Sequence, residues 1–207
     1  RLEFPLLAED RYELAQAFEA GGAYAVLHPG ARPVYRRWPV ERYRQVAGAL
    51  AAEGFELVLI GSAEERDLAD TVAVGLSGRV TNLAGRTSLG ALAALLDGAA
   101  VFVGNDSGPA HVARAVGTPT VTIYGSARLE NWGPLDTQGH RAFYRPLPCR
   151  PAGCDACAWD YFCLRSISAE AVIMAALEIA RDRSPDIASG ASDAAVVHGG
   201  WRTSARG

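Results

Sequence analysis

The chain has 207 residues, of which 49% are hydrophobic and 21% are charged, with a formal net charge of −3. This composition is ordinary for a globular protein with a sizeable core, and the length suits one large domain or one domain with appendages. The acidic balance argues against binding of nucleic acid through overall charge, and no apolar run approaches the ~18–20 residues of a membrane span.

Apolar runs and amphipathic stretches alternate along the chain, which predicts alternating strands and helices. In chain order the predicted elements are a helix over 9–20, a strand over 23–28, a helix over 40–54, a strand over 55–61, a helix over 63–76, a strand over 79–85, a helix over 88–98, a strand over 100–105, a helix over 108–116, a strand over 119–125, loop with at most one helical turn over 126–140, a short strand over 141–146 and a helix over 167–182. This order predicts an α/β fold with a doubly wound, Rossmann-like parallel sheet.

Sheets of this kind bind ligands beyond the carboxyl ends of their strands. The loops at those ends are 29–38, 61–65, 83–88 and 105–111. All 20 basic residues of the chain are arginines. An anion bound at this edge must therefore be held by arginine, histidine or backbone N–H groups.

The loop after the predicted strand over 100–105 has the features of a phosphate site. Asp106, Ser107 and Gly108 lead into a helix, and the first turn of a helix offers free N–H groups and a positive dipole end. Gly108 allows a close approach of the backbone, the Ser107 hydroxyl can donate to a phosphate oxygen, and His111 lies one turn further on. In the alternative interpretation, Asp106 and Ser107 only cap the helix and His111 is an ordinary core or surface histidine.

Four motifs follow one another along the chain: HPGA over 28–31 with RRWP over 36–39, LVLIGSAEERDLA over 57–69, NLAGRTSL over 82–89, and GNDSGPAH over 104–111 with GTP over 117–119. Together they resemble the sequence pattern of glycosyltransferase family 9, which contains the ADP-heptose:lipopolysaccharide heptosyltransferases. The resemblance extends over about residues 23–180.

The resemblance implies one half of a two-domain enzyme. Such transferases have the GT-B architecture, with two Rossmann-like domains and an active site in the cleft between them, and the matched motifs belong to the C-terminal, donor-binding half. Residues 1–22 would then lead in from a missing N-terminal domain, residues 23–183 would bind the nucleotide sugar, and residues 184–207 would be a disordered tail. The start at Arg1, without methionine or signal peptide, also suggests a fragment.

The similarity assigns roles in the loop over 105–111. Ser107, Gly108 and the helix that follows would take the donor diphosphate, with His111 nearby, and Asp106 would contact the sugar or organise the loop. Electrostatic stabilisation of the departing nucleoside diphosphate would be this half's share of catalysis.

One of two adjacent arginines lies where the family usually has a phosphate-contacting lysine. Arg36 occupies that position and would keep the charge while changing the contact geometry, unless it is a solvated loop arginine. We expect Arg37 at the surface.

The nucleoside would be bound at two further loops. Glu64 or Glu65 would accept hydrogen bonds from the ribose hydroxyls, although a glutamate at a helix start is also favoured by the helix dipole alone. The loop over 83–88, with Leu83 and Gly85, would border the base, mainly through its backbone.

The resemblance further implies an inverting transfer whose general base is an aspartate of the N-terminal domain. No catalytic residue is then expected in this chain, and donor binding without transfer is expected of the chain alone. The donor would be ADP-heptose and the acceptor a lipopolysaccharide core or other lipid-linked saccharide. The enzyme would work in the cytoplasm at the inner membrane face, with peripheral membrane contact at most, no nucleic acid partner and no cofactor for transfer.

The four cysteines, Cys149, Cys154, Cys157 and Cys163, all lie within 15 positions in the spacing C-x4-C-x2-C-x5-C. Nothing in the sequence suggests export, which disfavours disulfides. Four thiolates with one C-x-x-C pair suit a structural zinc ion, and an iron–sulfur cluster less well. Separate reduced thiols are the alternative. Some family members carry a similar stretch just before the last helix, which does not fix its role. We expect the cysteine-rich stretch over 149–163 to staple a loop between the last strand and the last helix, with no part in the chemistry.

Two other classes of function remain open from the sequence. One is a nucleotide- or phosphate-binding module that has lost transfer, and the other is a metal-stabilised interaction domain centred on the four cysteines.

Overall fold

The computed structural model describes residues 3–135, 137–149, 154, 157 and 159–184. Its strands are β1 Tyr24–His28, β2 Glu56–Leu59, β3 Val80–Asn82, β4 Val101–Asn105, β5 Thr120–Tyr124 and β6 His140–Tyr144. Its helices are α1 Ala8–Ala17, α2 Val40–Ala52, α3 Arg66–Ala73, α4 Leu89–Asp97, α5 Gly108–Ala115, α6 Leu129–Trp132, α7 Phe162–Arg165 and α8 Ala169–Arg183, with 3-10 turns η1 Val34–Arg36 and η2 Ala63–Glu65. Apart from Ser184, the predicted tail over 184–207 lies outside the described residues, as does part of the cysteine-rich stretch.

All six strands run parallel, in the order β3-β2-β1-β4-β5-β6. The predicted doubly wound parallel sheet is therefore confirmed. The chain moves outward from β1 to β3 and then crosses over to β4 on the other side of β1. Sheets of this topology form a crevice at that reversal, beyond the carboxyl ends of the two central strands.

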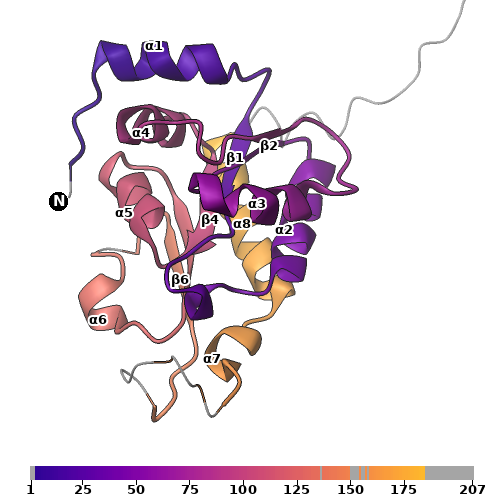
Figure 1. Cartoon of the computed structure of the whole chain (residues 1–207), viewed down its shortest axis with the longest axis vertical. Coiled ribbons are helices and arrows are strands. Elements are labelled where there is room, and N and C mark those ends of the chain that lie inside the picture. Colours follow the sequence, from indigo (N-terminus) through magenta and orange to yellow (C-terminus); the bar gives the residue numbers. More distant parts are fainter. Residues whose placement is uncertain (1–2, 136, 150–153, 155–156, 158, 185–207) are drawn as a thin grey trace, which may run out of the picture.

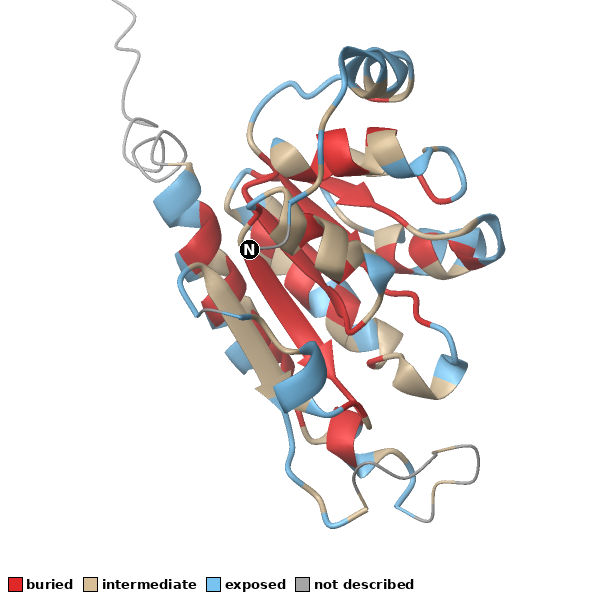
Figure 2. Cartoon of the chain, turned by 90° about the vertical axis from the view of Figure 1, so that its left-hand side faces the viewer, coloured by how far each residue is buried: buried red, intermediate tan, exposed pale blue. Residues whose placement is uncertain are grey.

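Helices cover both faces of the sheet (Figure 1). Helices α2, α3 and α8 pack on one face, and α4 and α5 pack on the other. Successive strand residues point to opposite faces, so Leu27 and Leu59 enter the first core while Val26 and Val58 enter the second. Both faces are buried (Figure 2), which explains why the central strands are continuous apolar runs.

The predicted elements agree with the structure to within a few residues at their ends. The spacing of Val40, Tyr43, Val46, Ala47 and Leu50 predicts one apolar face on α2. The last four are buried, and Val40 is only partly buried. The structure adds η1 and α7, which we did not predict. Both are single turns, too short to show a helical period in the sequence.

Helix α1 is the outermost layer of the fold and lies on α4 (Figure 1). It buries no residue. Its Leu14 and Ala17 are partly buried and pack against the core cluster on the α4 side of the sheet. Polar contacts add to this attachment, because the Glu13 carboxylate accepts hydrogen bonds from the backbone N–H and the hydroxyl of Ser88, at 3.0 and 2.7 Å. Arg11 pairs with Asp97 at the other end of α4. Among the described residues, no helix is both long and apolar enough to cross a membrane.

The buried side chain of Asn105 joins the end of β4 to the loop over 29–38. Its Oδ1 accepts from the backbone N–H of Trp38 at 3.0 Å, and its Nδ2 donates to the carbonyls of Pro29 and Gly30, both at 3.0 Å. All three backbone groups are in the protein interior, where water cannot reach them, so the Asn105 side chain supplies the hydrogen bonds that they need. This one amide therefore fixes where the loop over 29–38 lies relative to the start of α5.

Replacing Asn105 by alanine leaves those three buried backbone groups without partners. Each such group costs about 1–3 kcal/mol, so we expect Asn105→Ala to lower the free energy of unfolding by roughly 3 kcal/mol or more. Asn82→Ala is the matched control, because Asn82 ends β3 and also makes three side-chain hydrogen bonds, but at a largely solvent-accessible site. Its expected loss is about 1 kcal/mol. Equal losses in urea denaturation would contradict this role of Asn105.

Candidate functional site

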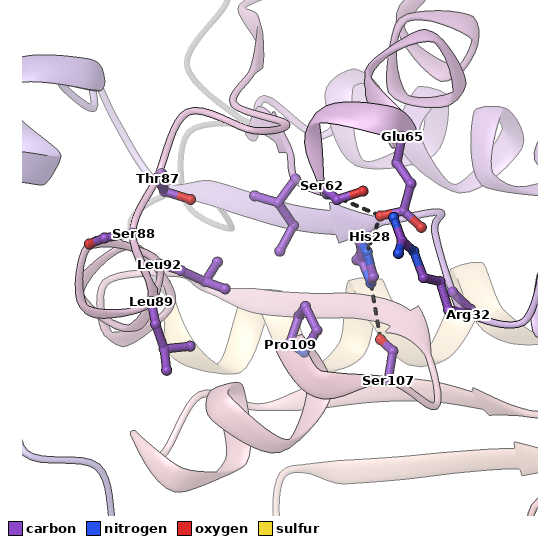
Figure 3. Close-up of a pocket in the computed structure, with 13 residues that line it drawn as sticks. His28, Arg32, Ser62, Glu65, Thr87, Ser88, Leu89, Leu92, Ser107 and Pro109 are labelled. Carbon is purple, nitrogen blue, oxygen red and sulfur yellow. Dashed lines mark hydrogen bonds and ion pairs between the residues drawn. The ribbon is translucent and has the colours of Figure 1, made fainter.

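A cavity of about 400 Å³ opens at the carboxyl ends of β1, β2 and β4 (Figure 3). It lies at the reversal of strand order, where this fold places its ligands. One side of its wall is apolar, with Ile60, Leu89 and Leu92, and the other side is polar, with His28, Glu65 and Ser107. An apolar wall facing a few convergent polar groups is the usual character of a small-molecule site.

The polar side of the cavity is a chain of hydrogen bonds across three loops (Figure 3). His28, the last residue of β1, has its Nδ1 3.0 Å from Ser107 Oγ and its Nε2 3.4 Å from Glu65 Oε2. The second oxygen of Glu65 accepts from Arg37 at 3.2 Å, and the Ser62 N–H donates to Glu65 Oε2 at 3.0 Å. The hydrogen bond with His28, assisted by Ser62 and Arg37, outweighs burial and lowers the pKa of Glu65 to about 2.

Room for the Glu65 carboxylate depends on Gly30. A Cβ at Gly30 would lie 2.3 Å from that carboxylate, which is buried and held by three hydrogen-bond partners and so cannot easily move aside. The glycine of the HPGA motif therefore has a packing role in this structure.

A second polar cluster surrounds Asp106, which is 6% exposed. Its carboxylate lies 3.9 Å from Arg36 Nη1 and 3.8 Å from His111 Nε2, too far for hydrogen bonds but close enough for charge attraction. Burial raises the pKa of Asp106, opposed by His111, Arg36 and Arg114. The Nε of Arg36 is buried and has no hydrogen-bond partner among the described residues. Arg36 and His111 thus lie near the Asp106 carboxylate without forming a hydrogen bond to it.

Arg114 and Trp132 hold the His111 ring. Arg114 Nη2 lies 2.7 Å from His111 Nδ1, and Trp132 packs edge-on against the imidazole at a centroid distance of 5.8 Å. A guanidinium can only donate, so Nδ1 accepts and Nε2 carries the hydrogen that faces Asp106. Burial and the nearby Arg114 lower the pKa of His111, and Asp106 opposes them.

At the start of α5, the structure does not show the capping by Ser107 that the alternative interpretation requires. Ser107 is the N-cap residue, but its side chain makes no capping hydrogen bond. Gly108 has no atom within 4 Å of where a Cβ would be, and its backbone is not in the left-handed region. The described part of the fold therefore leaves room for a side chain at this position.

The structure separates the two glutamates that the sequence left equivalent. Glu65 is buried beside the cavity, whereas Glu64 is exposed and pairs with Arg32 at 2.9 Å. Leu83, the first residue of the loop over 83–88, is fully buried in a core cluster and does not line the cavity. Gly85 has φ +71° and a Cβ there would meet Ala63 at 2.7 Å, so it shapes the loop. The members of the loop that reach the cavity are Thr87 and Ser88.

One expectation about the loop over 29–38 was wrong. Arg37 was expected at the surface, but its side chain is 25% exposed and bonded to Glu65 and to the carbonyl of Ala31. We also did not assign a separate role to His28, Arg114 or Trp132. The signal for His28 was present, since it is a polar residue that ends an otherwise apolar strand.

The four cysteines gather around one small cavity of about 10 Å³, lined also by Leu147 and Phe162. They form no disulfide, and Cys163 is buried. The Tyr161 N–H donates to Cys157 Sγ at 3.3 Å. Within the described residues, no three His, Cys, Asp or Glu side chains are placed as ligands of a metal ion.

Comparison with known proteins gives the family. A model for glycosyltransferase family 9 (heptosyltransferase) matches residues 2–157, three quarters of the chain. This chain belongs to glycosyltransferase family 9. Among its curated relatives, lipopolysaccharide heptosyltransferase 3 of Escherichia coli is 37% identical over 136 residues, covering 63% of this chain and 40% of the relative.

Two solved structures of family members have the same fold. E. coli ADP-heptose lps heptosyltransferase II superposes with a TM-score of 0.72 at 24% identity, covering 87% of this chain and 54% of that one. E. coli heptosyltransferase WaaC with ADP gives a TM-score of 0.62 at 26% identity, covering 83% and 49%. The family 9 chain described here thus spans about two fifths of the first curated relative and about half of the solved chains.

The charge of Glu65 should make this region sensitive to acid. Its folded-state pKa lies below the ordinary value of 4.5, so its stabilising effect is complete above about pH 5 and is lost as pH falls toward about 2. We expect Glu65→Gln to destabilise the protein at pH 7 by on the order of 3 kcal/mol, and the gap from wild type to shrink between pH 5 and pH 3.

Urea denaturation across this pH range measures the effect. Glu64→Gln is the control, because Glu64 is the exposed neighbour and should change the stability little at any pH. A gap for Glu65→Gln that stays constant with pH, or an equal gap for Glu64→Gln, would contradict the assignment.

Proposed function

We propose that this chain is the C-terminal, donor-binding half of a heptosyltransferase-like glycosyltransferase, which transfers the sugar of ADP-heptose to a lipopolysaccharide core or another lipid-linked saccharide. One observation carries the proposal. In a chain of family 9, Arg36 and His111 both lie against Asp106 at the start of α5, beyond the ends of β1 and β4. Support comes from the relatives, which are lipopolysaccharide heptosyltransferases, one of them solved with ADP.

The cavity suggests how the donor lies. Its apolar side chains suit a base, and the Glu65 carboxylate on its polar side suits the ribose hydroxyls, which are donors. The diphosphate would then reach Ser107 and the Gly108 N–H at the start of α5, where the helix dipole favours negative charge. This arrangement leaves the sugar beside Asp106, with Arg36 and His111 on either side.

Charge stabilisation is the chemistry that these groups supply. When the bond between sugar and diphosphate breaks, negative charge grows on the departing nucleoside diphosphate. Arg36 has a buried N–H without a partner among the described residues and lies near Asp106, so it can turn to that charge at low cost. The Nε2–H of the half-buried His111 faces the same place.

The remaining steps are assigned to the part of the enzyme that this chain does not span. An inverting transfer needs a base that activates the acceptor hydroxyl on the opposite face of the sugar, and we assign it to an aspartate of an N-terminal domain. The chain alone would bind the donor and transfer little or nothing. Transfer would need no cofactor and would take place at the cytoplasmic face of the inner membrane, where lipid-linked acceptors are accessible.

The first test measures the binding of ADP to the chain through the rise in its thermal unfolding temperature. Ligand at about 100 times its dissociation constant adds roughly 2.7 kcal/mol, a rise in Tm of roughly 5–10 °C for this size of domain. We expect the rise with ADP to exceed those with GDP, UDP and CDP. No rise with any of them would contradict donor binding and would favour a function other than transfer.

Gly108→Ala tests where the diphosphate binds. The added methyl meets no protein atom, so the unfolding temperature without ligand should not fall, but it stands where the phosphate approaches the backbone. We expect the ADP-dependent rise to be lost. Gly22→Ala is the matched control. A Cβ at Gly22 also meets nothing within 4 Å, and this residue precedes β1, at the amino ends of the strands and away from the cavity. A full ADP effect in Gly108→Ala would refute this placement.

The four cysteines are proposed as ligands of one structural zinc ion. The donor set fits zinc, and the thiols already line one cavity, although closing a ligand set needs a rearrangement of this loop. Elemental analysis of the purified chain should find one zinc per chain, lost in Cys154→Ser, with iron counted in the same sample. A metal-free, stably folded protein would refute the site.

A further inference from the structure

The hydroxyl of Ser107 has one hydrogen and several acceptors that compete for it. The carbonyl oxygen of Asn105 lies 3.2 Å from Ser107 Oγ, and His28 Nδ1 lies 3.0 Å from it. A bound phosphate oxygen would be a third acceptor. Which of them receives the hydrogen depends on whether His28 accepts or donates at Nδ1.

Glu65 determines whether the other ring nitrogen of His28, Nε2, carries a hydrogen. A carboxylate can only accept, and Glu65 stays ionised because its pKa is held at about 2. His28 Nε2, 3.4 Å from Glu65 Oε2, therefore carries a hydrogen in either charge state of the ring. Only Nδ1 is left to change when His28 gains or loses a proton.

The two states of His28 prepare Ser107 for opposite partners. With a neutral ring, Nδ1 accepts the Ser107 hydrogen, and the serine then presents lone pairs to the cavity, which repel a phosphate oxygen. With a protonated ring, Nδ1–H donates to Ser107 Oγ, so the serine hydrogen is released toward the cavity. An anion that needs a donor at this point favours the protonated ring.

We propose that His28 is a positioning residue that directs the Ser107 hydroxyl toward the donor diphosphate and takes up a proton as the diphosphate binds. This inference rests on the proposed function, because it takes the diphosphate to lie at Ser107.

Several charged groups lie around His28. The Glu65 carboxylate, from η2, lies 3.4 Å from His28 Nε2, and Arg37, from the loop over 29–38, lies 3.2 Å from the other oxygen of that carboxylate. Arg32 also lines the cavity, but it pairs with the exposed Glu64. On the α5 side are Asp106, Arg36 and His111, which face one another. A diphosphate adds negative charge to this set and so favours proton uptake by the buried imidazole.

Calorimetric titration of the chain with ADP in two buffers of different ionisation enthalpy counts the protons taken up. Above pH 7.5 the phosphate is fully ionised, so uptake then belongs to the protein. We expect wild type to take up a measurable fraction of a proton, and its ADP affinity to fall by up to tenfold per pH unit as pH rises.

His28→Asn separates positioning from simple packing. The amide nitrogen of asparagine can take the place of Nδ1 and donate to Ser107 without titrating, so this variant should bind ADP with near wild-type affinity at pH 8.5 and take up no proton. His28→Ala should bind at least tenfold more weakly. His140→Asn is the matched control, because His140 Nδ1 also faces a hydroxyl, that of Thr120, at 3.0 Å but at the opposite edge of the sheet. It should retain the proton uptake.

The outcomes distinguish the inference from the proposed function. Binding of ADP without proton uptake, or uptake that survives in His28→Asn and disappears in His111→Asn, would overturn the role of His28 and leave donor binding intact. If wild type binds neither ADP nor inorganic pyrophosphate, both proposals fail together.

Discussion

The three hydrogen bonds of the buried Asn105 amide are the constraint on which the site depends. They connect the end of β4 to the loop over 29–38, and they add to the Arg37–Glu65 bond and the buried Trp38 side chain in holding that loop on the fold. That loop carries Arg36 toward Asp106 and Arg37 toward Glu65. One amide thus positions cations from one loop against carboxylates from two others, at a point where parallel strands leave a crevice between their ends.

The fold could be read from the sequence because local and global preferences agree. Apolar runs bounded by glycine and proline became the strands, and α2 buried the face that its spacing predicted. The loops that line the candidate site were also predictable, because doubly wound sheets bind their ligands beyond the carboxyl ends of the strands. The single turns η1 and α7 were missed because they are determined by contacts across the fold and not by a periodic pattern.

The pairings inside the site could not be predicted in the same way. Glu64 and Glu65 are adjacent and look alike in sequence, yet one is in solvent and the other is held by His28 and Arg37. The difference arises because the 3-10 turn η2 directs the Glu65 side chain inward and the Glu64 side chain outward. The sequence does not reveal the orientation of so short a turn. Arg37 was misplaced for the same reason, since its partner comes from another loop. Motifs located the loops, and three-dimensional packing decided which side chains meet.

The central claim is that the crevice held by Asn105 binds a nucleoside diphosphate, and chemical-shift mapping tests it most directly. In a 1H–15N correlation spectrum of the chain titrated with ADP, the account predicts the largest changes at backbone amides of 28–31, 61–65, 87–89 and 105–111, which surround one cavity. Residues at the amino ends of the strands should not shift. Changes confined to the cysteine-rich stretch or to α1, or no change at saturating ADP, would contradict the account.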